Sequence, residues 1–190
     1  MKKTALLFST LFFFMSCAEK KYLKEVISNE KISITLKETF EETYYNLNIP
    51  IEFELNLNDD KIISAIPYFE IDDKRGFSGD NYYIDKRGKK KMFSLDRYKP
   101  YNYPTNIYIV SEKRKITKEE VIELIKKYNP SKTIESLKSK NDTIYLTPYL
   151  QYRKDNPQFL YEMRKQPDSL ILSIYIKGKG SKVVGERINW

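Results

Sequence analysis

The stretch "YNLNIPIEFELNL", Tyr45 to Leu57, decides the fold because polar and apolar residues alternate along its whole length. Its odd positions are apolar or aromatic, and its even positions are Asn, Pro or Glu. A period of two puts one kind of side chain on each face of a strand, so the stretch predicts a half-buried β-strand. Pro50 lies on the polar face and has no N–H for a ladder, which predicts that this strand lies at an edge or is broken there.

The segments around this strand carry further strand signals. Before it, residues 32–36 alternate between apolar and polar, and after it residues 58–61 have turn composition and residues 62–71 resume an apolar run. The turn and the second run predict a hairpin with the first stretch. Further strands are expected at residues 82–84, 91–95, 106–110, 143–152 and 170–176, and around Val183. Short strands separated by turn signals are typical of a sandwich or barrel.

Two helices are expected in the C-terminal half. Thr117 and Glu120 have the spacing of a capping box, and apolar residues follow at helical spacing until Asn129. A second, short helix is expected from Pro157, with Asn156 as its cap. The fold class is therefore predicted as mainly β, or β-rich α+β: an antiparallel β-sandwich-like domain with one or two short helices.

The N-terminus has the layout of a secretory signal. Lys2 and Lys3 precede an uncharged run from Ala5 to Met15, and small residues follow. A run of about eleven residues is shorter than the roughly twenty that a transmembrane helix needs. We therefore expect residues 1–16 to be the signal peptide of an exported protein.

The end of this run, Phe14-Met15-Ser16-Cys17, resembles the lipobox of bacterial lipoproteins. The resemblance implies that Cys17 carries acyl chains, palmitate among them, and anchors the chain in the bacterial cell envelope. Ala18 follows in place of an aspartate, which in the family implies the outer membrane; the periplasmic and the surface side both stay open. Cys17 is the sole cysteine, so a disulfide-linked partner is not expected. The alternative is cleavage after Ala18, because small residues stand at both positions that such a site requires, and this would leave a soluble chain.

The rest of the chain is expected to form one domain. Residues 17–30 are polar and predict a tether behind the lipidated cysteine. Residues 31–190 have the size of a single β-rich domain. A subdivision near residue 117, into an all-β part and an α+β part, is the alternative.

Charge and composition limit the classes of function. The net charge is +8, and for an exported chain this favours acidic phospholipid headgroups, anionic glycans or an acidic protein over nucleic acid. The chain contains no histidine, which excludes Ser-His-Asp and Cys-His catalysis and the usual transition-metal sites. Adjacent acidic residues fall at expected turns and at a helix start. We therefore expect no catalytic residue, no metal and no cofactor.

Two segments are candidates for contact with a membrane or a partner. The first is the densest basic run, with Lys86, Arg87, Lys89, Lys90 and Lys91; the alternative is a solvated loop. The second is "RYKPYNYP", which presents Arg97, Tyr98, Tyr101 and Tyr103 among two prolines. Its tyrosines could form a contact surface or cover one end of a sandwich.

These observations predict a lipid-anchored binding protein of the cell envelope without catalytic activity. Its basic and tyrosine-rich loops would contact a protein or a glycan. One alternative is an immunity-type lipoprotein that neutralises a toxin in the periplasm. The other is a hydrolase that uses two carboxylates across a cleft.

Overall fold

The computed structural model describes residues 20–40, 42–71, 74–75, 83–92, 94–95, 98, 102–165 and 167–190. Cys17 and the predicted signal peptide lie outside these residues, as do Arg97 and Tyr101. Within the described ranges, no helix has both the length and the apolar character that crossing a membrane requires.

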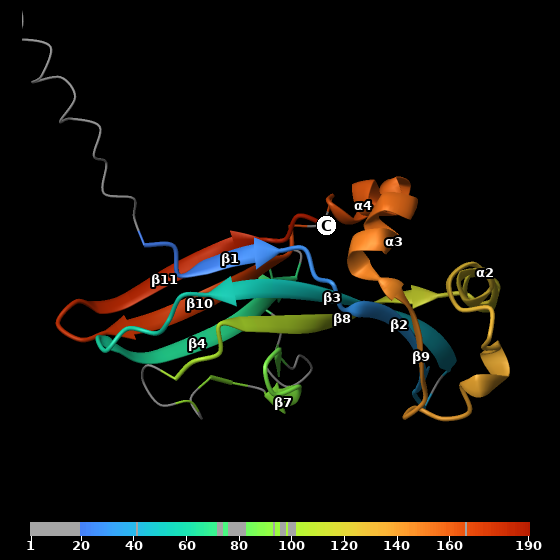
Figure 1. Cartoon of the computed structure of the whole chain (residues 1–190), viewed down its shortest axis with the longest axis horizontal. Helices are drawn as coiled ribbons and strands as arrows, with labels where there is room; N and C mark the ends of the chain where they lie inside the picture. The colour runs from blue at the N-terminus through green and yellow to red at the C-terminus, as the bar shows by residue number, and fades with distance from the viewer. Residues whose placement is uncertain are drawn as a thin grey trace, which may run out of the picture.

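Strands dominate the described residues (Figure 1). The strands are β1 (Leu23–Val26), β2 (Lys31–Glu38), β3 (Thr43–Leu55), β4 (Ile62–Ile71), β5 (Lys74–Arg75), β6 (Tyr83–Asp85), β7 (Lys90–Met92), β8 (Asn106–Ile116), β9 (Thr143–Pro148), β10 (Ser169–Ile176) and β11 (Gly180–Arg187). The helices are α2 (Lys118–Tyr128), α3 (Tyr149–Asp155) and α4 (Pro157–Met163), with a 3-10 turn at Ile134–Ser136.

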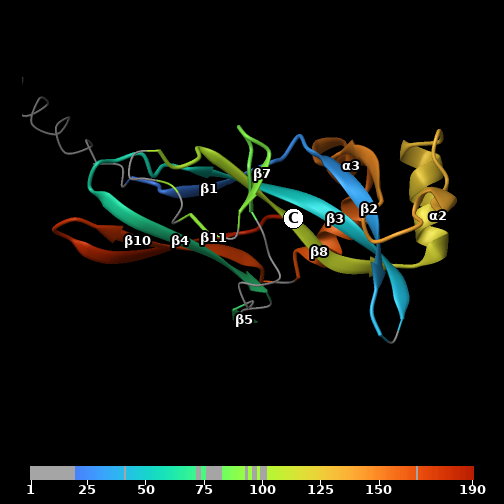
Figure 2. The same cartoon turned by 90° about the horizontal axis from the view of Figure 1, so that it is seen from below.

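The strands form two antiparallel sheets, which confirms the predicted mainly β, sandwich-like fold. The first sheet has seven strands in the order β7-β6-β8-β3-β2-β9, with β1 also paired to β3. The second has four strands in the order β11-β10-β4-β5. Figure 2 shows the two sheets as layers at one end of the molecule, while α2 and α3 lie toward the other end. One hydrophobic cluster, from Leu23 to Trp190, includes residues of both sheets and of the helices.

β3 is a central strand, so the prediction of an edge or broken strand was wrong. It pairs with β8 along one side, and along the other with β2 over residues 43–48 and with β1 over residues 52–55. Pro50 falls between these two partners, opposite Val110 of β8. Between the segments of β3 that pair with β2 and with β1, no strand among the described residues needs an N–H from Pro50. This explains how a proline is tolerated inside the sheet.

β3 is also buried on both faces along its middle, which corrects the prediction of a half-buried strand. Its apolar face enters the core, where Ile51 is 1% exposed and Phe53 is fully buried. On the polar face, Asn48 and Glu52 are each only 3% exposed. Neighbouring strands and the β6–β7 turn cover this second face, and the alternation of residue types gives no signal for such cover.

The predicted hairpin between residues 45–57 and 62–71 does not form. Residues 58–61 do turn, and Asp59 Oδ1 accepts a hydrogen bond from the backbone N–H of Lys61 at 3.0 Å. However, β4 pairs with β10 and β5 in the second sheet. Both edges of β3 are already occupied, so the chain crosses to the other layer instead of folding back in the same sheet.

The helices agree with the sequence in part. Thr117 and Glu120 form the expected capping box, and Asn129 ends α2. α4 begins at Pro157 as predicted, but Asn156 does not cap it through its side chain. Its amide donates to the hydroxyl of Tyr128 and to the carbonyl of Tyr152, both at 2.8 Å.

A third helix, α3, replaces the second half of the strand predicted at residues 143–152. Strand β9 ends at Pro148, and Tyr149 opens the helix. Tyr149 and Tyr152 are both buried. Their spacing of three residues places them on one helical face, a pattern that is too short to distinguish from strand alternation in sequence.

Strand β1 lies inside residues 17–30, the range for which the sequence predicts a tether. Leu23 is buried and pairs in register with Leu55 of β3. Ser28 is fully buried, and its hydroxyl accepts a hydrogen bond from the N–H of Glu30 at 3.1 Å. The first sheet therefore begins at Leu23, before the domain boundary expected at residue 31.

Candidate functional site

The outer face of the seven-stranded sheet, which faces away from the second sheet, contains a groove of about 660 Å³. Its floor follows from the strand register. Asn48 of β3 is opposite Ser33 of β2, and Ser33 is opposite Tyr145 of β9. In the other direction, Tyr108 of β8 is opposite Ile84 of β6. Residues in register share a face, so these side chains from five strands line one surface, which we call the sheet groove.

Asn48 has an unsatisfied polar atom in this floor. Its amide nitrogen donates to the hydroxyl of Thr35 at 3.0 Å and to that of Ser33 at 3.4 Å. Its Oδ1 atom is buried and has no hydrogen-bond partner among the residues that the structure describes. A buried acceptor without a partner costs about 1–3 kcal/mol, and this oxygen lies below the surface that a ligand in the groove would touch.

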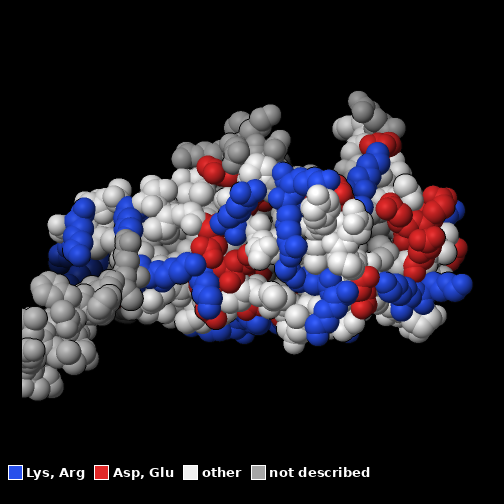
Figure 3. Space-filling model, turned by 90° about the horizontal axis from the view of Figure 1, so that it is seen from above, with Lys and Arg blue, Asp and Glu red and all other residues white. Residues whose placement is uncertain are grey.

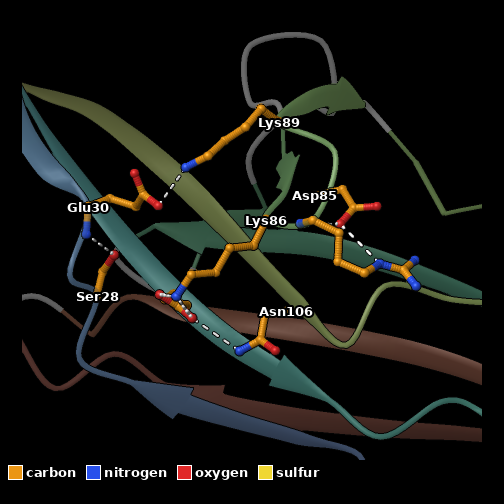
Figure 4. Close-up of polar contacts among 8 residues, drawn as sticks. Ser28, Glu30, Asp85, Lys86, Lys89 and Asn106 are labelled. Atoms are coloured by element: carbon orange, nitrogen blue, oxygen red, sulfur yellow. Dashed lines mark hydrogen bonds and ion pairs between the residues drawn. The ribbon is translucent and has the colours of Figure 1, made fainter.

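The β6–β7 turn forms one side of the sheet groove and is fixed to β3 by a buried carboxylate (Figure 4). Both carboxylate oxygens of Glu52 accept from Lys86 Nζ, at 2.7 Å and 2.8 Å. The side-chain amide of Asn106 donates to the same carboxylate at 3.1 Å. Glu52 is 3% exposed, so this pair is largely shielded from water and fixes the turn above the sheet.

A second ion pair links the same turn to the segment that enters β2. Lys89 Nζ lies 2.8 Å from Glu30 Oε1, and it stands over the Tyr108 ring at 5.8 Å from the centroid. Lys89 adopts a positive φ of 52°, which a non-glycine residue takes up at the end of a tight turn. These contacts place Glu30, Lys89 and Tyr108 together at the border of the sheet groove.

The base of the turn is held by Asp85. This carboxylate is 5% exposed and accepts from the backbone N–H of Arg87 at 3.0 Å, and Arg87 Nε lies 3.6 Å from it. The Tyr98 hydroxyl donates to Asp85 at 2.9 Å. Burial, followed by this hydrogen bond to an anionic acceptor, raises the pKa of Tyr98 above its ordinary value. Tyr98 therefore stays protonated and serves as a donor.

The structure separates the residues predicted for partner contact. Lys86, Arg87 and Lys89 each pair with a carboxylate, so they do not form an unneutralised basic patch. Lys89 and Lys91 line the sheet groove. The side chain of Lys90 and all of Arg97 and Tyr101 lie outside the described residues.

The tyrosine-rich segment covers the core where it is described. Tyr103 is 1% exposed, and Tyr98 packs against the hydrophobic cluster. The sequence left open whether these tyrosines form a contact surface or cover one end of the sandwich. Tyr98 and Tyr103 cover the sandwich. Tyr103 supplies no exposed aromatic surface for a partner, and Tyr98 is partly buried.

Sequence reasoning missed the groove floor. Asn48, Ser33 and Tyr108 carry no motif, and they are separated by as much as 75 residues in the chain. The sequence did contain one signal for the groove, the polar face of the alternating stretch. This face contributes Asn48 and Pro50 to the groove. Recognising the groove floor required the register of β2 and β8 against β3.

The groups in the sheet groove suit binding of a polar ligand. They include hydroxyls of Ser33, Thr35 and Thr143, the rings of Tyr108 and Tyr145, and the cations Lys31, Lys89 and Lys91 beside the single carboxylate of Glu30. Within the described residues, no group of three or more His, Cys, Asp or Glu could hold a metal ion. Comparison with protein-family models, with curated proteins and with solved structures finds no match to this chain.

Proposed function

We propose that this chain is a lipid-anchored binding protein of the cell envelope, without catalytic activity, whose sheet groove takes a segment of glycan. The observation that carries the proposal is the polar floor of the groove, where the side chains of Ser33, Thr35 and Asn48 lie near the Tyr108 and Tyr145 rings. A sugar hydroxyl can donate to a hydroxyl of this floor and at the same time accept from a neighbouring lysine. The groove volume of about 660 Å³ lies in the range of small-ligand sites.

The other groups in the sheet groove favour a sugar over an apolar ligand. Tyr108 and Tyr145 offer ring faces against which the C–H side of a pyranose can pack, with a hydroxyl on each ring for hydrogen bonds. Three lysines against one glutamate favour glycans that carry carboxylate or phosphate. Binding should therefore weaken as salt rises.

A matched pair of tyrosine variants tests the groove. Tyr145 lines it and Tyr161 belongs to α4, and both are 58% exposed. The probe is an array of neutral and acidic oligosaccharides, with the dissociation constants of bound glycans measured in solution. We expect Tyr145→Ala to weaken binding about tenfold, or ~1.4 kcal/mol, and Tyr161→Ala to leave it unchanged. Equal affinity of both variants, or no bound glycan, would overturn the assignment.

The anchor is tested separately, and the proposal for it rests on Cys17 being the sole cysteine behind a signal-like run. Cells that express the full gene with a clickable palmitate analogue should label the wild type, and the label should fractionate with membranes. Cys17→Ala should be unlabelled and soluble. An unlabelled wild type that begins at Glu19 would contradict lipidation and leave the groove experiment unaffected.

A further inference from the structure

One end of the molecule gathers three segments that are far apart in the sequence. The described chain starts there, and Lys20 Nζ lies 3.0 Å from Asp59 in the β3–β4 connection. The N–H of Lys177, which opens the β10–β11 turn, donates to the carbonyl of Lys61 at 2.7 Å. Lys182 Nζ stands over the Tyr22 ring at 5.4 Å from the centroid. Figure 1 shows this end at the left, with the β10–β11 turn as its tip; we call it the entry end.

The entry end is basic. The turn reads "KGKGSK" from Lys177 to Lys182 and contains no acid. Gly178 and Gly180 have φ values of 76° and 79°, which permit the tight turn, and Lys177 and Lys179 are exposed. Among the described residues neither of these two lysines makes an ion pair. The acids at this end include Asp59, which already pairs with Lys20, and the exposed Asp60.

The opposite end differs in charge. Helix α2 begins there with Glu119 and Glu120 in its first turn, and Lys126 and Lys127 follow in its last turn. On the face seen in Figure 3, acidic side chains gather at the right end, where Figure 1 places α2, whereas the left end shows Lys and Arg. The entry end therefore shows Lys and Arg on this face without the acidic cluster that the α2 end carries.

We propose that the entry end docks on anionic phospholipid headgroups and orients the domain on the membrane. The inference rests on the proposed anchor, which would hold this end near the membrane. Cys17 precedes Lys20 by three residues, and three residues of extended chain span at most about 10 Å. This distance is close to the Debye length at physiological salt, so the part of the entry end around Lys20 would feel the surface charge. Each lysine near such a surface strengthens binding about fivefold.

Docking in this way keeps the sheet groove accessible. Leu55 of β3 pairs with Leu23 near the entry end, and Asn48 precedes it by seven strand residues, about 23 Å. The groove would therefore stand clear of the headgroups and open to the side. A ligand could reach it while the domain stays on the membrane.

The test uses the full-length protein as processed by cells and reconstituted in vesicles of phosphatidylcholine, with or without phosphatidylglycerol. Since lipidated Cys17 has no free thiol, Ser181→Cys provides a unique labelling site in the β10–β11 hairpin for a fluorophore, and lipid-bound quenchers report its proximity to the surface. We expect strong quenching only in anionic vesicles, with loss at high salt. A label at Ser131→Cys, just past α2, should remain unquenched.

Charge variants identify the lysines responsible. Lys177→Gln/Lys179→Gln should abolish the quenching at position 181, and the matched pair Lys126→Gln/Lys132→Gln at the α2 end should retain it. Equal quenching in neutral and anionic vesicles, or quenching that the first pair does not reduce, would overturn the docking proposal.

Failure of the anchor would be distinguishable from failure of docking. In that case the released soluble chain is added to the same vesicles and sedimented. The first pair of substitutions should then lower the affinity for anionic vesicles about 25-fold, at about fivefold per lysine, and the second pair should not. Unchanged sedimentation would count against docking whatever the state of Cys17.

Discussion

Lys86 holds both carboxylate oxygens of Glu52, at 2.7 Å and 2.8 Å, and thereby ties the β6–β7 turn to the central strand of the larger sheet. The two ends of the pair differ in burial, because the side chain of Glu52 is 3% exposed and that of Lys86 is 39% exposed. The buried partner therefore depends on the exposed one for its neutralisation. This asymmetry makes the pair important for the shape of the sheet groove.

Replacing Lys86 with methionine should destabilise the protein because Glu52 would keep only the amide of Asn106. Breaking a fully buried ion pair costs about 3–5 kcal/mol, and breaking an exposed one costs about 0–1 kcal/mol. Because this pair is intermediate, we expect urea unfolding to show a loss of about 2 kcal/mol in the free energy of unfolding. The double variant Lys86→Met/Glu52→Gln should recover most of this loss. Lys126→Met, at an exposed position of α2, is the control, with a change in stability within about 0.5 kcal/mol. A Lys86→Met variant as stable as this control would refute the role of the pair.

Thr117→Ala should weaken the start of α2. The Thr117 hydroxyl accepts from the N–H of Glu120 at 3.1 Å, and Glu120 accepts in return from the N–H of Thr117 at 2.8 Å. Losing an N-cap side chain costs about 1 kcal/mol. Chemical denaturation should show this loss, and Thr117→Ser, which keeps the hydroxyl, should show little. Equal stability of the alanine and serine variants would show that the cap contributes nothing.

Trp190 fills a core site, is fully buried, and has an indole N–H without a hydrogen-bond partner among the described residues. Trp190→Ala should cost about 3–5 kcal/mol because it leaves a large cavity. Trp190→Phe keeps most of the ring volume and removes the unpaired donor, so it should cost only about 1 kcal/mol. Thermal unfolding of both variants gives the comparison. Similar losses for the two would mean that the indole N–H is satisfied in solution.

Glu25 should make stability depend on pH. Burial raises the pKa of Glu25 above its ordinary value, although the N–H of Asn189 and the charge of Arg153 act in the opposite direction. A raised folded-state pKa means that the folded protein holds the proton more tightly than the unfolded chain. Stability is therefore lost as pH rises from about 4.3 through the raised pKa.

The variant Glu25→Gln tests this sign. It carries no titrating group, so its stability relative to the wild type should increase between pH 4 and pH 7, measured by urea unfolding at each pH. A relative stability of Glu25→Gln that falls with pH would show that the attraction to Arg153 outweighs the cost of burial.

The candidate site was predictable only in part. The basic run was recognised, and Lys89 and Lys91 do border the sheet groove. The carboxylates that pair with this basic run were not recognised. Glu30 lies 59 residues before Lys89, and Glu52 lies 34 residues before Lys86. Tyr103 was a candidate for surface contact and lies in the core, since an aromatic residue in a proline-rich loop has the same sequence signature in either place.

By itself, the sequence determined the local features of this protein: the alternation in β3 and β10, the capping box of α2, and the turn at residues 58–61. Each depends on residues a few positions apart, so local periodicity and hydrogen bonding suffice to specify it. Only the tertiary structure decided that β3 is central, that β4 belongs to the other sheet, and that Asn48 lies in a groove. The physical reason is that strand pairing and burial of a second face depend on partners such as β8, tens of residues away, and alternation along one strand does not specify which strand will cover it.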